Sequence, residues 1–113
     1  MWRYQSLLRL ASAVVGNSSS GIVEAPSAGV PTVDIGMRQR GRLAAESVIH
    51  CADDADSIRA AIVKALTPEM QALAARRDNP YCAADTLGRM TDAVLAFLRT
   101  LPCKPKTFYN LPL

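Results

Sequence analysis

A short apolar run at residues 13–15 (Ala-Val-Val) stops at Gly16 and passes directly into a polar segment, residues 17–20 (Asn-Ser-Ser-Ser). The run is typical of a strand buried in a parallel sheet. Asparagine and serine are preferred residues at the start of a helix. A strand that enters a helix in this way favours an α/β fold, because the helix carries the chain back to begin a parallel neighbour.

The same alternation continues along the chain. Residues 32–35 and 47–51 predict a second and a third strand, with a polar, arginine-rich loop between them. Residues 17–20 are called the serine segment below. Helical spacing and start signals predict five helices: at residues 3–12, from the serine segment through Ala25, after Asp53 or Asp54, from Pro68, and over residues 84–101. Pro26 falls inside the second of these helices, and the pattern does not explain it.

This order predicts an α/β fold, a partial Rossmann-like layer of about three parallel strands with flanking helices. A chain of 113 residues fits one domain, expected here over residues 1–101, with residues 102–113 as an extended tail because of their prolines. Three dispersed cysteines favour free thiols over a disulfide framework or a zinc site. We therefore expect no metal and no cofactor.

Charge and hydropathy limit the partners. The net charge of +3 suits an anionic ligand, but the charge lacks the clustering of a typical nucleic-acid binder. No apolar stretch approaches the roughly 20 residues of a membrane span, and the first residues do not resemble a signal peptide. A soluble, cytoplasmic protein without nucleic-acid or membrane partners is expected.

The glycine and serine segment is a candidate anion site. The first N–H groups of a helix have no internal partners, and the helix dipole adds about half a positive charge there. Serine hydroxyls add donors, while Gly16 and Gly21 permit a close backbone approach. The alternative is structural, since asparagine and serine are also ordinary helix caps.

Further candidates lie in and beyond this segment. Glu24 could accept hydrogen bonds from ribose hydroxyls, or could be a solvated helix residue. The arginines at positions 38, 40 and 42 follow the second strand and should reach the same edge of the sheet, where guanidinium groups can clamp phosphate. A solvated basic loop is the alternative. His50 could act as a base or could simply be a polar strand end.

Several motifs in this order resemble the hydrolysing UDP-N-acetylglucosamine 2-epimerases. They are residues 16–27 (GNSSSGIVEAPS), 29–33 (GVPTV), 35–36 (IG), 38–42 (RQRGR), 46–49 (ESVI), 79–81 (NPY) and 106–109 (KTFY). The resemblance implies the two-domain GT-B architecture, with UDP bound mainly by the C-terminal domain. It implies that Ser18 and Ser19 hold the diphosphate, that Glu24 holds the ribose, and that Arg38 lines the same site.

Combining both lines of reasoning, we expect UDP or a UDP-sugar to contact Asn17, Ser18, Ser19, Ser20, Gly21, Glu24, Arg38 and Arg42. The family's reaction releases UDP and N-acetylmannosamine, and its acid/base residues are expected in an N-terminal part that this sequence does not match. The chain alone is therefore expected to be inactive. A non-catalytic module that pairs with a separate N-terminal half, or forms a homo-oligomer, is the alternative.

The resemblance covers only part of such an enzyme, and this has a structural consequence. The three strands would form one flank of a larger sheet, and the strand at Val14 would have an open edge. We therefore expect marginal stability for the isolated chain.

Overall fold

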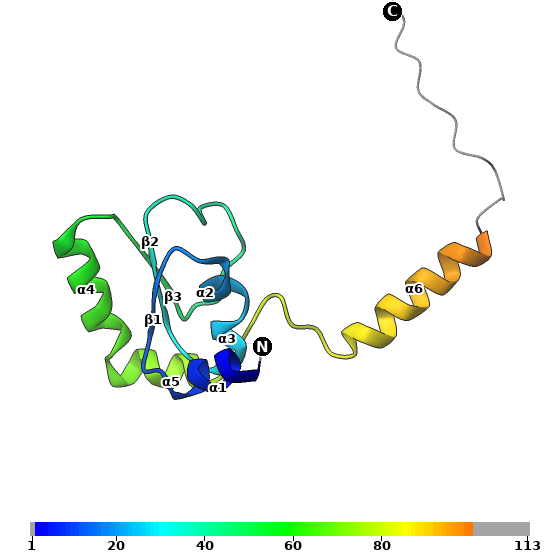
Figure 1. Cartoon of the computed structure of the whole chain (residues 1–113), viewed down its shortest axis with the longest axis horizontal. Helices are drawn as coiled ribbons and strands as arrows, with labels where there is room; N and C mark the ends of the chain where they lie inside the picture. The colour runs from blue at the N-terminus through cyan, green and yellow to red at the C-terminus, as the bar shows by residue number, and fades with distance from the viewer. Residues whose placement is uncertain (1, 101–113) are drawn as a thin grey trace, which may run out of the picture. The chain divides into compact units, whose positions relative to one another are not determined.

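The computed structural model of the chain describes residues 2–100 (Figure 1). The expected tail at residues 102–113, including the motif at 106–109, lies outside the described residues. The structure divides into two units, of which the first ends at Cys82 and the second begins at Ala83. The elements are α1 (Trp2–Leu10), β1 (Val14–Gly16), α2 (Ser19–Val23), α3 (Ala25–Ala28), β2 (Thr32–Ile35), β3 (Val48–Cys51), α4 (Ala55–Ala65), α5 (Pro68–Ala75) and α6 (Thr86–Thr100).

The three strands form one parallel sheet in the order β1-β2-β3. The predicted α/β class, with three parallel strands and flanking helices, is confirmed. Val33 of the central strand pairs with Val15 on one side and Ile49 on the other. Because the strands are parallel, the segments that follow β1 and β2 leave the sheet at the same edge, which is uppermost in Figure 1.

Alternate residues of the strands face two separate apolar clusters. On one face, Val33 packs with Ala61 and Ala65 of α4. On the other face, Ile22 of α2 packs with Ala45 and Val48. Figure 1 accordingly shows α4 and α2 on opposite sides of the strands. The small side chains of Ala61 and Ala65 bring α4 close to a sheet of only three strands.

The helix starts follow from their capping residues. Asp54, rather than Asp53, caps α4, and its carboxylate accepts a hydrogen bond from the N–H of Ser57 at 2.9 Å. Thr67 caps α5 in the same way through the N–H of Met70, at 3.3 Å. Pro68 then occupies the first turn, where a helix needs no donor from it.

The single helix expected from the serine segment through Ala25 is instead two short helices. α2 ends at Val23, and the N–H of Glu24 donates to the carbonyl of Ser20 at 2.8 Å. A new helix, α3, then begins with Pro26 in its first turn, a position that tolerates proline. The break explains the proline that the sequence pattern left unexplained.

Both outer strands have an unpaired side. Among the described residues, β1 pairs only with β2, and β3 pairs only with β2. Val15, in the middle of β1, keeps 47% of its surface exposed. The strand at Val14 thus has the open edge that was expected.

The second unit contains α6, which has an apolar stripe but no buried residue. Its exposed large side chains are Leu87, Met90, Val94, Leu95, Phe97 and Leu98. Throughout the part of the chain that the structure describes, no helix combines the length and apolar character of a membrane span.

Candidate functional site

The start of α2 presents the predicted anion-binding residues to solvent. Asn17, Ser18 and Ser19 are exposed, and Ser20 is partly buried. Ser18 is the helix cap, because its Oγ accepts a hydrogen bond from the N–H of Ser20 at 3.3 Å. The structural alternative for Ser18 therefore holds, but a hydroxyl that accepts one bond still has a proton to donate.

Gly21 fixes α2 against the central strand. A Cβ atom at Gly21 would lie 2.7 Å from Cγ2 of Thr32. The Thr32 hydroxyl donates to the Gly21 carbonyl at 2.8 Å, and both residues are buried. Glycine is required here by close approach of the helix to the strand. This contact holds the exposed serines in place beyond the end of β1.

α1 contacts the same side of α2 in two successive turns. Tyr4 and Ser20 share a hydrogen bond between their hydroxyls, and Gln5 Nε2 donates to Glu24 Oε2 at 3.4 Å. Residues four apart on a helix lie one above the other, so Ser20 and Glu24 share one side. The first helix of the chain thus links the serine segment to the carboxylate predicted to bind ribose.

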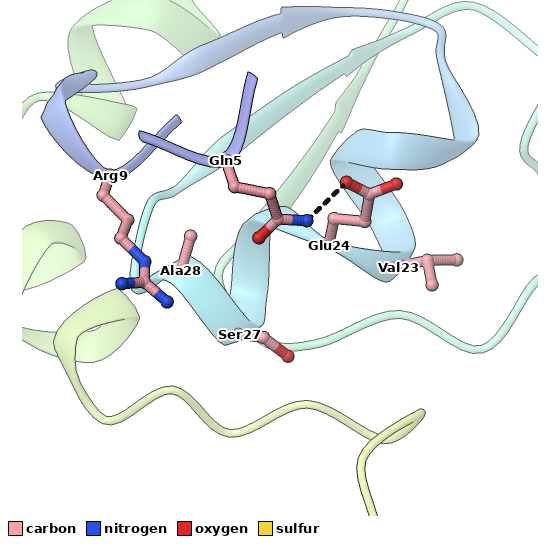
Figure 2. A pocket seen from close by; sticks show the side chains of 6 residues that line it. All are labelled: Gln5, Arg9, Val23, Glu24, Ser27 and Ala28. Atoms are coloured by element: carbon pink, nitrogen blue, oxygen red, sulfur yellow. Dashed lines mark hydrogen bonds between the residues drawn. The ribbon is translucent and has the colours of Figure 1, made fainter. Parts of the chain in front are cut away.

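Glu24 lines a pocket of about 230 Å³ between α1 and the α2–α3 pair. Figure 2 shows Gln5 between the Arg9 guanidinium and the Glu24 carboxylate, with Ser27 lower in the view. The pocket is lined by Gln5, Arg9, Val23, Glu24, Ser27 and Ala28. Several hydrogen-bonding groups around a small concave space suit a polar ligand with hydroxyl groups.

Gln5, Arg9 and Ser27 were not predicted as site residues. Only their contact across α1 and α3 reveals them, and helix spacing alone gave no signal. Ser27 is itself held in place, since Asn79 Nδ2 donates to its Oγ at 2.6 Å and to the Val23 carbonyl at 2.8 Å. The motif at residues 79–81 therefore supports the wall of this pocket.

The loop after β2 is fixed against the turn after β1. Gln39 has only 3% of its surface exposed, and its Nε2 donates to the main-chain carbonyl of Asn17 at 2.8 Å. Arg38 precedes this anchor directly, and the N–H of Arg42 donates to the Gln39 carbonyl at 3.2 Å. Both arginines are exposed, and neither forms an ion pair within residues 2–100. The loop that carries them therefore meets the predicted anion site.

Asp34 and His50 form a pair that was not predicted. Nδ1 of His50 donates to Oδ2 of Asp34 at 2.8 Å, and the Asp34 side chain is only 1% exposed. His50 is thus more than the polar strand end considered from the sequence. The neighbouring thiol of Cys51 has a pKa above its ordinary value because of burial, with smaller contributions from the carboxylates of Asp34 and Asp54.

The sequence of the chain is similar to those of several known proteins. A family model described as UDP-N-acetylglucosamine 2-epimerase matches residues 1–95. The chain is 29% identical over 109 residues to the "Polysialic acid biosynthesis protein P7" of Escherichia coli, covering 96% of this chain and 28% of that protein. It is 49% identical over 47 residues to the "GDP/UDP-N,N'-diacetylbacillosamine 2-epimerase (hydrolyzing)" of Campylobacter jejuni, covering 42% and 12%.

A "UDP-N-acetylglucosamine 2-epimerase" of Neisseria meningitidis is 48% identical over 59 residues, covering 52% of this chain and 16% of that enzyme. The chain therefore spans less than a third of the length of each of these relatives. The family match, in contrast, extends over β1, the serine segment, the arginine loop and most of α6. The chain belongs to the UDP-N-acetylglucosamine 2-epimerase family.

Proposed function

We propose that this chain is the UDP-binding portion of a hydrolysing UDP-N-acetylglucosamine 2-epimerase. The whole enzyme would convert UDP-N-acetylglucosamine and water to N-acetylmannosamine and UDP. One observation carries the proposal: the exposed Ser18 and Ser19 at the start of α2 lie within two helical turns of Glu24, which follows α2 and lines a pocket of about 230 Å³. Diphosphate and ribose are adjacent in UDP, and the two parts of this site lie at the two ends of one short helix.

In the proposed complex, Asn17, Ser18, Ser19, Ser20 and Gly21 surround the diphosphate. Each hydrogen bond to a charged phosphate contributes about 1.5–3 kcal/mol. Glu24 accepts hydrogen bonds from the ribose, and Arg38 and Arg42 approach from the loop that Gln39 anchors. The exposed guanidinium groups form no ion pair with another residue in the range 2–100 and are available to an anion.

The proposed reaction breaks the bond between the anomeric carbon and UDP as C2 loses its proton. A glycal-like intermediate forms, and water then adds to give N-acetylmannosamine. Negative charge develops on the departing UDP, so preset donors at the start of α2 would stabilise the transition state. The acid/base groups would come from a part of the enzyme outside this sequence, and this chain alone would have no turnover.

A second candidate is a non-catalytic module that binds UDP and assembles with a separate N-terminal half. The exposed edge of β1 favours such an assembly, because β1 pairs only with β2 among the described residues. The two candidates share the nucleotide site. They differ in whether adding an N-terminal half restores the release of N-acetylmannosamine.

Titration of the 113-residue chain with UDP tests the shared site. We expect a millimolar Kd, about −4 kcal/mol, and shifts of the main-chain amide signals of residues 17–21 in nuclear magnetic resonance spectra. Ser19→Glu places a carboxylate where the diphosphate binds and should abolish these shifts. Ser12→Glu is the matched control, since Ser12 is exposed and precedes β1 at its opposite end. A folded sample with no response to 10-fold the expected Kd, about 10 mM UDP, would contradict the proposal.

A further inference from the structure

The central strand carries a buried carboxylate that has one ionisable partner among the described residues. The side chain of Asp34 is 1% exposed, and its partner is His50, with 45% of its side chain exposed. Burying a carboxylate is unfavourable unless it is paired and hydrogen-bonded. An apolar residue at position 34 would avoid this penalty. Packing alone therefore does not explain the pair.

The position of the pair places it at the edge where ligands bind in parallel α/β sheets. Gly16, Asp34 and His50 occupy one row across the three strands, as the register of β1-β2-β3 shows. Adjacent strands lie about 4.8 Å apart, so the row spans about 10 Å. Gly16 at one end of the row leads directly into the serine segment.

The imidazole lies on the same face of the sheet as α2. Val48 packs with Ile22 of α2, whereas Ile49 packs toward α4, and alternation then places His50 with Val48. The bond to Asp34 draws the ring from the outer strand toward the central one, and so toward β1. Nδ1 is occupied by this bond, which leaves Nε2 as the nitrogen for a further partner.

We propose that His50 is an additional contact for the diphosphate of the nucleotide, with Asp34 as its positioning residue. The protonated ring donates from Nδ1 to Asp34 and from Nε2 to a phosphoryl oxygen. The proposal rests on the proposed function. No covalent bond changes, and the ring takes its second proton from solvent.

Other ionisable groups lie on the segments that adjoin the pair. The loop after β2 contributes three arginines and Glu46, the turn after β3 contributes Asp53 and Asp54, and α2 is followed by Glu24. On α4, Lys64 lines a pocket together with His50. The thiol of Cys51 has a pKa above its ordinary value because of burial. Imidazoles change charge between about pH 5 and 8.

His50 is the only histidine of the chain, so its imidazole gives a single, unambiguous resonance. The 113-residue chain is titrated with UDP, and the imidazole and main-chain amide signals are followed together. We expect UDP to shift the imidazole signal at pH 6, and uridine, which lacks phosphate, to leave it unchanged. If the amides of residues 17–21 shift while the imidazole does not, the His50 contact is wrong and the UDP site stands. If neither responds, both are wrong.

Two variants sharpen the test. His50→Gln should bind UDP about tenfold more weakly than the unmodified chain at pH 5.5 and equally well at pH 8.5. At each pH, the Kd of His50→Gln is divided by the Kd of the unmodified chain, and in this ratio the titration of UDP itself cancels. Asp34→Asn keeps an acceptor for Nδ1 but removes the carboxylate that holds the ring, and should weaken UDP binding at pH 5.5 less than His50→Gln does. A ratio that stays constant with pH would overturn the proposal.

Discussion

Gln39 donates a hydrogen bond to the main-chain carbonyl of Asn17 across 2.8 Å, which ties the arginine loop to the turn at the start of α2. The two residues are 22 positions apart in the chain. Gln39 is buried, and its Oε1 has no hydrogen-bond partner among the residues that the structure describes. Among the described residues, the buried amide of Gln39 therefore forms this one hydrogen bond. The bond sets the distance between the loop and the serine segment.

Replacing Gln39 with alanine should weaken both the fold and UDP binding. Loss of the bond leaves the Asn17 carbonyl without its donor, at a cost of about 1–3 kcal/mol in unfolding free energy. Gln71 offers a matched control, because its Nε2 donates to the carbonyls of Ser12 and Ala65 at the opposite end of β1. Urea unfolding should show both variants destabilised, and UDP titration at 10 °C should show weaker binding for Gln39→Ala alone. Equal Kd values for the two variants would contradict the role of Gln39 at the site.

Gly21→Ala should destabilise the chain through a steric clash with Thr32. The added Cβ would lie 2.7 Å from Cγ2 of Thr32, and overpacking of this kind costs about 1–3 kcal/mol. Thr32→Ser removes that methyl group and keeps the hydroxyl that donates to Gly21. The double variant should therefore recover most of the stability lost in Gly21→Ala, as measured by urea unfolding. Purely additive losses in the double variant would show that another contact is responsible.

Glu24→Gln should reduce the preference of the chain for UDP over 2′-deoxy-UDP. A hydrogen bond from the 2′-hydroxyl to a carboxylate corresponds to about a tenfold preference, and a neutral amide gives less. Glu69→Gln removes the same charge from the first turn of α5 and should leave the preference unchanged. The readout is the ratio of the two Kd values for each variant. An unaltered ratio in Glu24→Gln would show that this carboxylate does not bind the ribose.

The cap of α4 should make stability depend on pH. Hydrogen bonds from the Ser57 hydroxyl, and then from its main-chain N–H, hold the pKa of Asp54 below its ordinary value. A carboxyl whose pKa falls on folding stabilises the fold above its unfolded pKa of about 3.9, and this contribution is lost as the pH falls through the folded pKa. The unmodified chain should thus melt at a higher temperature than Asp54→Asn at pH 7, and this difference should shrink below about pH 4.

Asp56→Asn serves as the control for that experiment. Asp56 is also acidic and lies in the first turn of α4, but it is not the capping residue. Its melting temperature should change less than that of Asp54→Asn at pH 7. If both variants behave alike, the general charge of the helix start, rather than the cap, would explain the pH dependence.

The sequence predicted the parts of the fold that local patterns determine. Short apolar runs ending at Gly16 and Gly36 gave the first two strands, and alternation with helices gave their parallel order. The break after α2 was missed because Ile22 and Ala25 keep helical spacing across it. Pro26 was the local signal, and its place in a new first turn could have been inferred.

The parts of the site that depend on distant contacts could not be predicted. The bonds of Gln39 to Asn17 and of His50 to Asp34 join different loops and strands, and no spacing rule connects such positions. A charged residue within an apolar strand was a usable signal for Asp34, because such a residue needs a partner when buried. The roles assigned to the serines, Glu24, Arg38 and Arg42 stay predictions until a ligand is measured.

The unpaired sides of β1 and β3 have a consequence for how copies of the chain meet. When β3 of one copy adds to β1 of the next, the contact uses two different surfaces and can repeat from copy to copy. The rotation between successive copies then decides whether the assembly closes into a ring or extends as a filament. Without a segment that covers β1, association of this kind would increase with the concentration of the chain.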